Sequence, residues 1–108
     1  MDQLMFRQGD VLIMKIDRRP HGAWKEEPRD EQDRVILAAG EVTGHHHAIR
    51  NPNVCLLRAE GVSDAVMTVA RECLLEHEEH APIAIPPGEY VVRIQREWDG
   101  ALSRAVAD

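Results

Sequence analysis

Short stretches in which apolar and polar residues alternate run along most of the chain, and this two-residue period predicts β-strands. The clearest stretch follows a proline-rich turn at residues 85–88, where Tyr90, Val92, Ile94 and Trp98 alternate with polar or charged neighbours. We expect one strand that continues to Trp98 and turns these apolar side chains toward the core.

Further stretches are short, apolar and bounded by turn residues. This pattern is typical of the strands of a compact β domain. They cover residues 11–16, 34–38, 45–50 and 54–59. Residues 11–16 are apolar on both faces, which predicts a central strand. We expect residues 51–53 to form a turn that joins the strands at residues 45–50 and 54–59 into a hairpin.

Residues 65–77 are compatible with two structures. Val66, Val69 and Cys73 fit the spacing of a helix capped by Ser63 or Asp64, whereas residues 66–69 also suit a strand. Because the neighbouring stretches are all β, we expect two short strands and keep one helix as the alternative. The predicted fold class is all-β, a small barrel or sandwich of short, mostly antiparallel strands with at most one short helix.

Residues 17–33 interrupt the pattern with Pro20, Gly22, Pro28 and many charges, which predicts a charged loop. A loop of this length is either mobile or functional, and Trp24 is expected to anchor it. Residues 99–108 form a polar tail with room for one more short element.

Composition places the chain in a broad class. Its 108 residues fit a single domain, residues 1–108, and 44% hydrophobic residues allow one ordinary core. The net charge of -6 disfavours a dedicated nucleic-acid binder, although Arg93, Arg96 and Arg104 could form a local basic strip.

The cysteines and the N-terminus suggest an intracellular setting. Cys55 and Cys73 lack metal-type spacing and are expected to be reduced core residues, although a disulfide between them stays open. Residues 1–4 have no basic and apolar leader pattern, and no apolar run reaches the length of a membrane span. We therefore expect a cytoplasmic protein.

Histidines supply the strongest chemical signal. On a strand, His45 and His47 share one face while His46 points to the other, so the first two could bind one metal ion. A third ligand is expected from His77 or His80 on a distant segment. The predicted metal ligands are therefore His45, His47, His77 and His80.

The expected ion is Zn²⁺, with iron, nickel or manganese as alternative transition metals. Glu78 or Glu79 could add a carboxylate, and Asp10 could orient an imidazole from the second layer of ligands. An open coordination position would permit hydrolysis by a metal-activated water. Whether the protein is an enzyme, and on which substrate, stays open at this point.

Other interpretations compete with a metal site. The histidines could simply be solvated, or two of them could act as acid and base in a metal-free ribonuclease that uses Arg93 or Arg96. A non-catalytic module could instead bind a protein or RNA through residues 17–33. Because small β domains often self-associate to hide strand edges or to complete a site, we also expect a homodimer.

Several motifs resemble a known pattern. They are residues 40–47 with Thr-Gly-His-His-His, residues 77–83 with His-Glu-Glu-His-Ala-Pro-Ile, residues 86–90 with Pro-Pro-Gly-Glu-Tyr, residues 96–98 and residues 104–108. Together they resemble a family of short bacterial proteins of uncharacterised function. The resemblance spans most of the chain outside residues 17–33, and it implies no activity, cofactor or catalytic residue.

Overall fold

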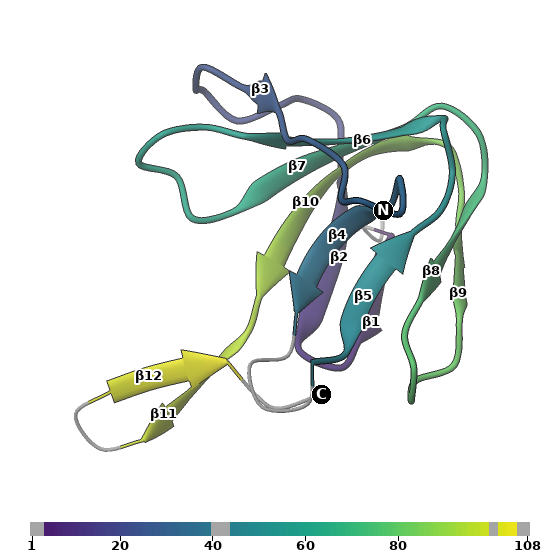
Figure 1. Ribbon diagram of the computed structural model, residues 1–108. Helices are drawn as coiled ribbons and strands as arrows, with labels where there is room; N and C mark the ends of the chain where they lie inside the picture. The colour runs from purple at the N-terminus through teal and green to yellow at the C-terminus, as the bar shows by residue number, and fades with distance from the viewer. Residues whose placement is uncertain (1–3, 40–43, 100–101, 106–108) are drawn as a thin grey trace.

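The computed structural model describes residues 4–39, 44–99 and 102–105, which form β-strands and no helix (Figure 1). The strands are β1 (Met5–Gln8), β2 (Val11–Ile16), β3 (Lys25–Glu26), β4 (Val35–Ala39), β5 (His46–Ile49), β6 (Val54–Arg58), β7 (Ala65–Val69), β8 (Cys73–Glu76), β9 (Ile83–Ile85), β10 (Gly88–Ile94), β11 (Arg96–Asp99) and β12 (Leu102–Ala105). The all-β prediction is confirmed, and the helical alternative for residues 65–77 is wrong. No helix that is long and apolar enough to span a membrane occurs in the described part of the chain.

Two antiparallel sheets face each other in a sandwich-like arrangement. One sheet has the order β1-β2-β10-β7-β6-β3, and the other has the order β4-β5-β8-β9. A separate hairpin of β11 and β12 extends away from this body (Figure 1). The predicted central position of residues 11–16 is confirmed, because β2 lies between β1 and β10.

The turn at residues 51–53 does not close the predicted hairpin. β5 pairs with β4 and β8, whereas β6 pairs with β3 and β7, so the turn carries the chain from one sheet to the other. The side-chain carboxamide of Asn51 accepts hydrogen bonds from the backbone and side chain of Asn53 and rigidifies this corner.

The expected single strand that ends at Trp98 is divided in two. β10 ends at Ile94, and the chain leaves the body at Gln95, whose backbone N–H donates to the carbonyl oxygen of Asp10 at 2.7 Å. The following residues form β11, which pairs with β12, so the tail does contain a further short strand.

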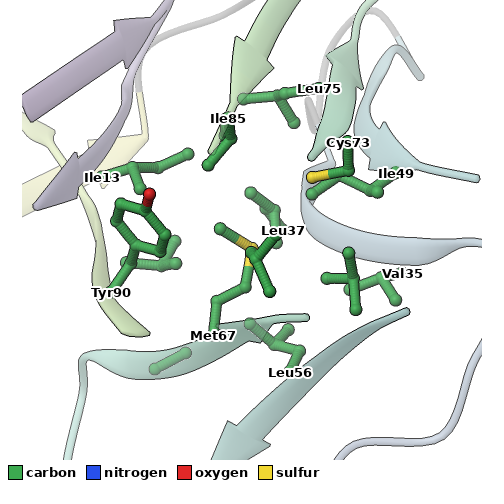
Figure 2. Packing of buried hydrophobic residues seen from close by; sticks show 14 of the residues in the cluster. Ile13, Val35, Leu37, Ile49, Leu56, Met67, Cys73, Leu75, Ile85 and Tyr90 are labelled. Carbon is green, nitrogen blue, oxygen red and sulfur yellow. The ribbon is translucent and has the colours of Figure 1, made fainter. Parts of the chain in front are cut away.

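The core between the sheets is mainly aliphatic (Figure 2). Ile13, Leu56 and Met67 from the larger sheet meet Leu37 and other side chains of the smaller sheet. Tyr90 is fully buried among them and keeps its hydroxyl satisfied by donating to the carbonyl oxygen of Pro86 at 2.7 Å. A continuous apolar contact surface of this kind supplies most of the driving force for folding.

Residues 17–33 are held to the body by several contacts. The Trp24 indole N–H donates to the carbonyl oxygen of Pro20, and Gly22 lies between the Trp24 ring and Ala59 of the body. The Arg29 guanidinium donates to backbone carbonyl oxygens at the corner between the sheets. The predicted loop therefore contains a short strand, β3, and Arg29 fastens it to the corner between the sheets. The Trp24 hydrogen bond stays within the loop, so its anchoring role stays a prediction.

Replacing Leu56 by alanine tests the core. Leu56 is 1% exposed, and we expect the Leu56→Ala variant to lose about 2–5 kcal/mol of unfolding free energy because a cavity remains. Urea denaturation measures the loss, with Leu4→Ala as a control because Leu4 is 40% exposed. Equal losses in the two variants would contradict this description of the core.

Candidate functional site

Four imidazole rings lie close together at one end of the sandwich. His77 is at the centre of the group, with ring-centroid distances of 4.3 Å to His47, 4.5 Å to His80 and 5.4 Å to His45. His47 and His80 are nearly parallel, and their centroids are 5.8 Å apart. The four histidines selected from the sequence therefore share one location, although they come from two distant segments.

Strand topology explains this convergence. His47 lies near the start of β5, and His77 follows the end of β8, which is the antiparallel neighbour of β5. The chain then turns at His80 before it enters β9. In an antiparallel pair, the first residues of one strand lie beside the last residues of the other, at the same end of the sheet. These rings therefore become neighbours.

His47 is fully buried, and a single side chain fixes its protonation. The Gln8 amide nitrogen donates to the carbonyl oxygens of Leu75 and Ala81 at 3.1 Å and 2.9 Å. The Gln8 carbonyl oxygen, 2.8 Å from His47 Nδ1, can only accept. His47 therefore carries a proton on Nδ1, and in its neutral form it presents a lone pair on Nε2.

This lone pair faces a carboxylate. His47 Nε2 lies 3.4 Å from Oδ1 of Asp10, which is only 6% exposed. Asp10 is positioned by the tight turn between β1 and β2, where Gly9 has a positive φ of 56°. Two electron-rich atoms held this close are stabilised by a cation that both can bind, either a proton or a metal ion.

His77 holds the turn of residues 77–80 in place through its ring nitrogen Nδ1. Its Nδ1 accepts hydrogen bonds from the backbone N–H groups of Glu79 and His80 at 3.0 Å and 3.3 Å. In the neutral form its proton is consequently on Nε2, an atom that is buried. His77 thus stabilises the turn of residues 77–80 and also lies in contact with the other three rings.

The carboxylates of this turn contact the remaining histidines. Glu79 lies 3.7 Å from His45 Nδ1, and Glu78 lies 4.0 Å from His46 Nδ1. The His46 backbone N–H also donates to Glu78 at 2.9 Å, and this bond lowers the pKa of the Glu78 carboxyl. His46 alternates with the buried His47 along β5 and lines a hollow on the outer side, which Ala48, Arg50 and the clustered His77 also line.

Gly44 precedes the histidines with a φ of +72°, and an added Cβ would meet nothing within 4 Å. The backbone conformation, rather than crowding, therefore favours glycine here. The other residues of the predicted turn, 40–43, lie outside the described residues.

No group of three or more His, Cys, Asp or Glu side chains among the described residues is arranged to hold one metal ion as it stands. The turn bonds of His77 Nδ1 contribute to this result, because that nitrogen already accepts two N–H groups. The prearranged part of the site is the Asp10 and His47 pair. Further donors would have to come from the surrounding histidines by side-chain rotation.

Sequence reasoning placed Asp10 near an imidazole, but it missed Gln8. The available signal was weak, because a glutamine beside a Gly-Asp turn usually lies in solvent. Arg93, considered as a ribonuclease cation, makes an ion pair with Asp64 at 2.9 Å that raises the pKa of Arg93. Neither cysteine belongs to the cluster, and both are free thiols.

Comparison with known proteins gives a family and no activity. A family model described as a domain of unknown function (DUF8820) matches residues 7–95. No curated protein and no solved structure matches this chain.

The two cysteines should differ in reactivity. Burial raises the pKa of Cys73 to about 11, whereas Cys55 is partly exposed. We expect a thiol reagent at pH 8 to modify Cys55 in the folded protein and Cys73 only after unfolding, because the thiolate is the reacting form. Rapid modification of two thiols per folded chain would contradict the burial of Cys73.

Burial of this thiol also predicts a pH dependence of stability. The Cys73 pKa rises from 9.0 to about 11 on folding, so the unfolded chain loses this proton first. The free energy of unfolding should then decrease as the pH rises from 9 to 11, with no effect of this group below pH 9. A Cys73→Ala variant should show a smaller decrease in urea denaturation, and an unchanged slope would exclude this contribution.

The protonation of His47 can be observed directly. We expect ¹⁵N NMR near neutral pH to show a proton on Nδ1 of His47, and Gln8→Met to lose about 1–3 kcal/mol of stability because three hydrogen bonds disappear. Gln32→Met is the control, since Gln32 is exposed in a loop. A proton on Nε2 alone would refute the role assigned to Gln8.

Proposed function

The chain belongs to the family described as a domain of unknown function (DUF8820), and we propose that it binds a divalent transition metal ion at its histidine cluster. The observation that carries the proposal is the arrangement of Gln8, His47 and Asp10. Gln8 directs the lone pair of a buried imidazole nitrogen toward a buried carboxylate oxygen. Metal-binding histidines are oriented by the same kind of hydrogen bond at their other ring nitrogen.

The distance within this pair suits metal binding better than a direct hydrogen bond. The 3.4 Å between His47 Nε2 and Asp10 Oδ1 exceeds the usual hydrogen-bond range of roughly 2.7–3.2 Å. Two ligand atoms on one tetrahedral zinc ion, with bonds of about 2.1 Å, lie about 3.4 Å apart. The pair therefore has the spacing of two neighbouring corners of a zinc coordination sphere.

The surrounding rings could complete the ligand set. Two imidazoles on one tetrahedral ion have centroids about 5 Å apart, and the observed separations in the cluster range from 4.3 to 5.8 Å. His80 is the best third donor because its ring is nearly parallel to that of His47, with the two centroids 5.8 Å apart. His77 would have to exchange its turn bonds for the ion, and His45 lies farther out.

The donor set favours zinc, since imidazole and carboxylate are common zinc ligands and thiolates do not take part. With three protein ligands, an ion would keep one position for water and lower its pKa toward neutrality, which is the basis of hydrolytic catalysis. Hydrolysis is accordingly the first chemistry to test once metal binding is established.

Metal analysis tests the proposal. We expect protein freed of tag and adventitious metal to retain or rebind about one zinc ion per chain, with Co²⁺ giving the absorption of a tetrahedral site. Asp10→Asn and His80→Ala should each weaken zinc binding about 10-fold or more, and His45→Ala/His47→Ala should abolish it. His21→Ala is the matched control, because His21 is exposed in the loop of residues 17–33.

Circular dichroism of each variant separates loss of binding from loss of the fold. Zinc binding that survives in a folded Asp10→Asn/His80→Ala variant would refute the assigned ligands. A wild-type protein that binds no metal would refute the proposal itself. A proton shared by His47 and Asp10 would then be the required cation, and the acid–base interpretation would take its place.

A further inference from the structure

The outer face of the four-stranded sheet adjoins the histidine cluster at one end, where His77 and Glu76 line the same hollow, and extends away from it. We define this outer face by the side chains on or next to β4, β5, β8 and β9 that alternate with the core side chains: Ile36, Ala48, Arg50, Glu72, Leu74, Glu76 and Ala84. The strand register places them side by side, with Ile36 opposite Ala48, Ala48 opposite Glu76, and Leu74 opposite Ala84. Their neighbours along each strand, such as Ile49, Leu75 and Ile85, are the fully buried core residues.

This outer face combines a protruding apolar side chain with a recess beside it. Leu74 is 52% exposed. A hollow of about 470 Å³ opens next to it and is lined by Leu74, Ala84, Arg50 and Glu76 among others. The small side chain of Ala84 leaves this hollow open, so a leucine from another molecule would find space there, whereas Ala48 is already buried.

On the outer face, the positive charge lies beside β5 and the negative charges lie along β8. Arg50 follows β5, whereas Glu72 and Glu76 lie at the two ends of β8. The pair that joins Arg50 and Glu76 is long, 3.7 Å, with side chains 55% and 49% exposed. Such a solvated ion pair holds its partners weakly, so each group can take another partner at little cost.

We propose that a second copy of this chain docks on the outer face through a two-fold axis that runs along the strands between β5 and β8. This axis places β5 of each copy over β8 of the other, so Arg50 meets the partner copy's glutamates. It also directs Leu74 of each copy toward the hollow of the other. The surface is thus complementary to itself in charge and in shape, as a two-fold interface requires.

The sequence-based expectation of a homodimer rested on hidden strand edges or a completed site, whereas the proposed dimer uses the face of a sheet. β3 is a two-residue edge of opposite charges, and the β9 edge is flanked by Pro82 and Pro86, which limits strand addition. The net charge of -6 on each chain opposes association in general. The outer face carries the cation Arg50 beside two glutamates, so pairing of Arg50 with the glutamates of the other copy offsets part of this repulsion.

Sedimentation equilibrium on the full chain tests the proposal. We expect a dimer of the 12.2 kDa chain at concentrations on the order of 100 µM, as suits a small interface. Leu74→Glu should raise the dissociation constant by about tenfold or more. Met5→Glu is the matched control and should leave it unchanged, because Met5 is equally exposed, at 51%, on the other sheet.

A charge-reversal mixture identifies the pairing. Arg50→Glu and Glu72→Arg chains should each be mainly monomeric alone and should form a heterodimer when mixed, because the reversed charges meet across the interface. A wild-type monomer at all concentrations would overturn the proposal, and so would a dimer that Met5→Glu disrupts and Leu74→Glu does not. Zinc binding should be unaffected by these variants, so failure of the dimer leaves the proposed metal site untouched.

Discussion

The side-chain amide of Gln8 ties together the parts of the molecule on which the candidate site depends. It extends from β1 of the larger sheet and donates to the carbonyl oxygens of Leu75 and Ala81 in and beyond β8 of the smaller sheet. The carbonyl oxygen of the same amide accepts a hydrogen bond from the N–H group at His47 Nδ1. The contact between the sheets, the position of the turn after β8 and the tautomer of the buried imidazole are therefore set by one group. Buried amides are costly unless every donor and acceptor is used, and here all are.

Secondary structure could be predicted largely from the sequence because strands leave a local signal. Alternation around Tyr90 and Val92 and the apolar run at residues 11–16 depend only on neighbouring residues. The assignment of strands to sheets has no such signal. Asn51-Pro52-Asn53 indicates a change of direction, but it does not indicate whether the next strand pairs with the previous one or joins the opposite sheet.

In the candidate site, too, some features could be predicted from local sequence and others only from the tertiary fold. Histidine spacing identified His45, His47, His77 and His80, and antiparallel pairing of β5 with β8 brings their rings together. Gln8 could not be found in this way, because its role depends on carbonyl groups more than sixty residues away. Local sequence thus reports which side chains are chemically able to act, while the tertiary fold determines their protonation and their partners.

The corner at residues 51–53 has a consequence for how the molecule opens. Because β5 and β6 belong to different sheets, and β9 and β10 likewise, the backbone passes repeatedly between the two layers. Neither layer can separate without pulling strands out of the other. The sandwich should therefore behave as a single cooperative unit in which amide protons of both layers exchange through the same global opening. The donors of the candidate site, drawn from both layers, would disperse together in that one event.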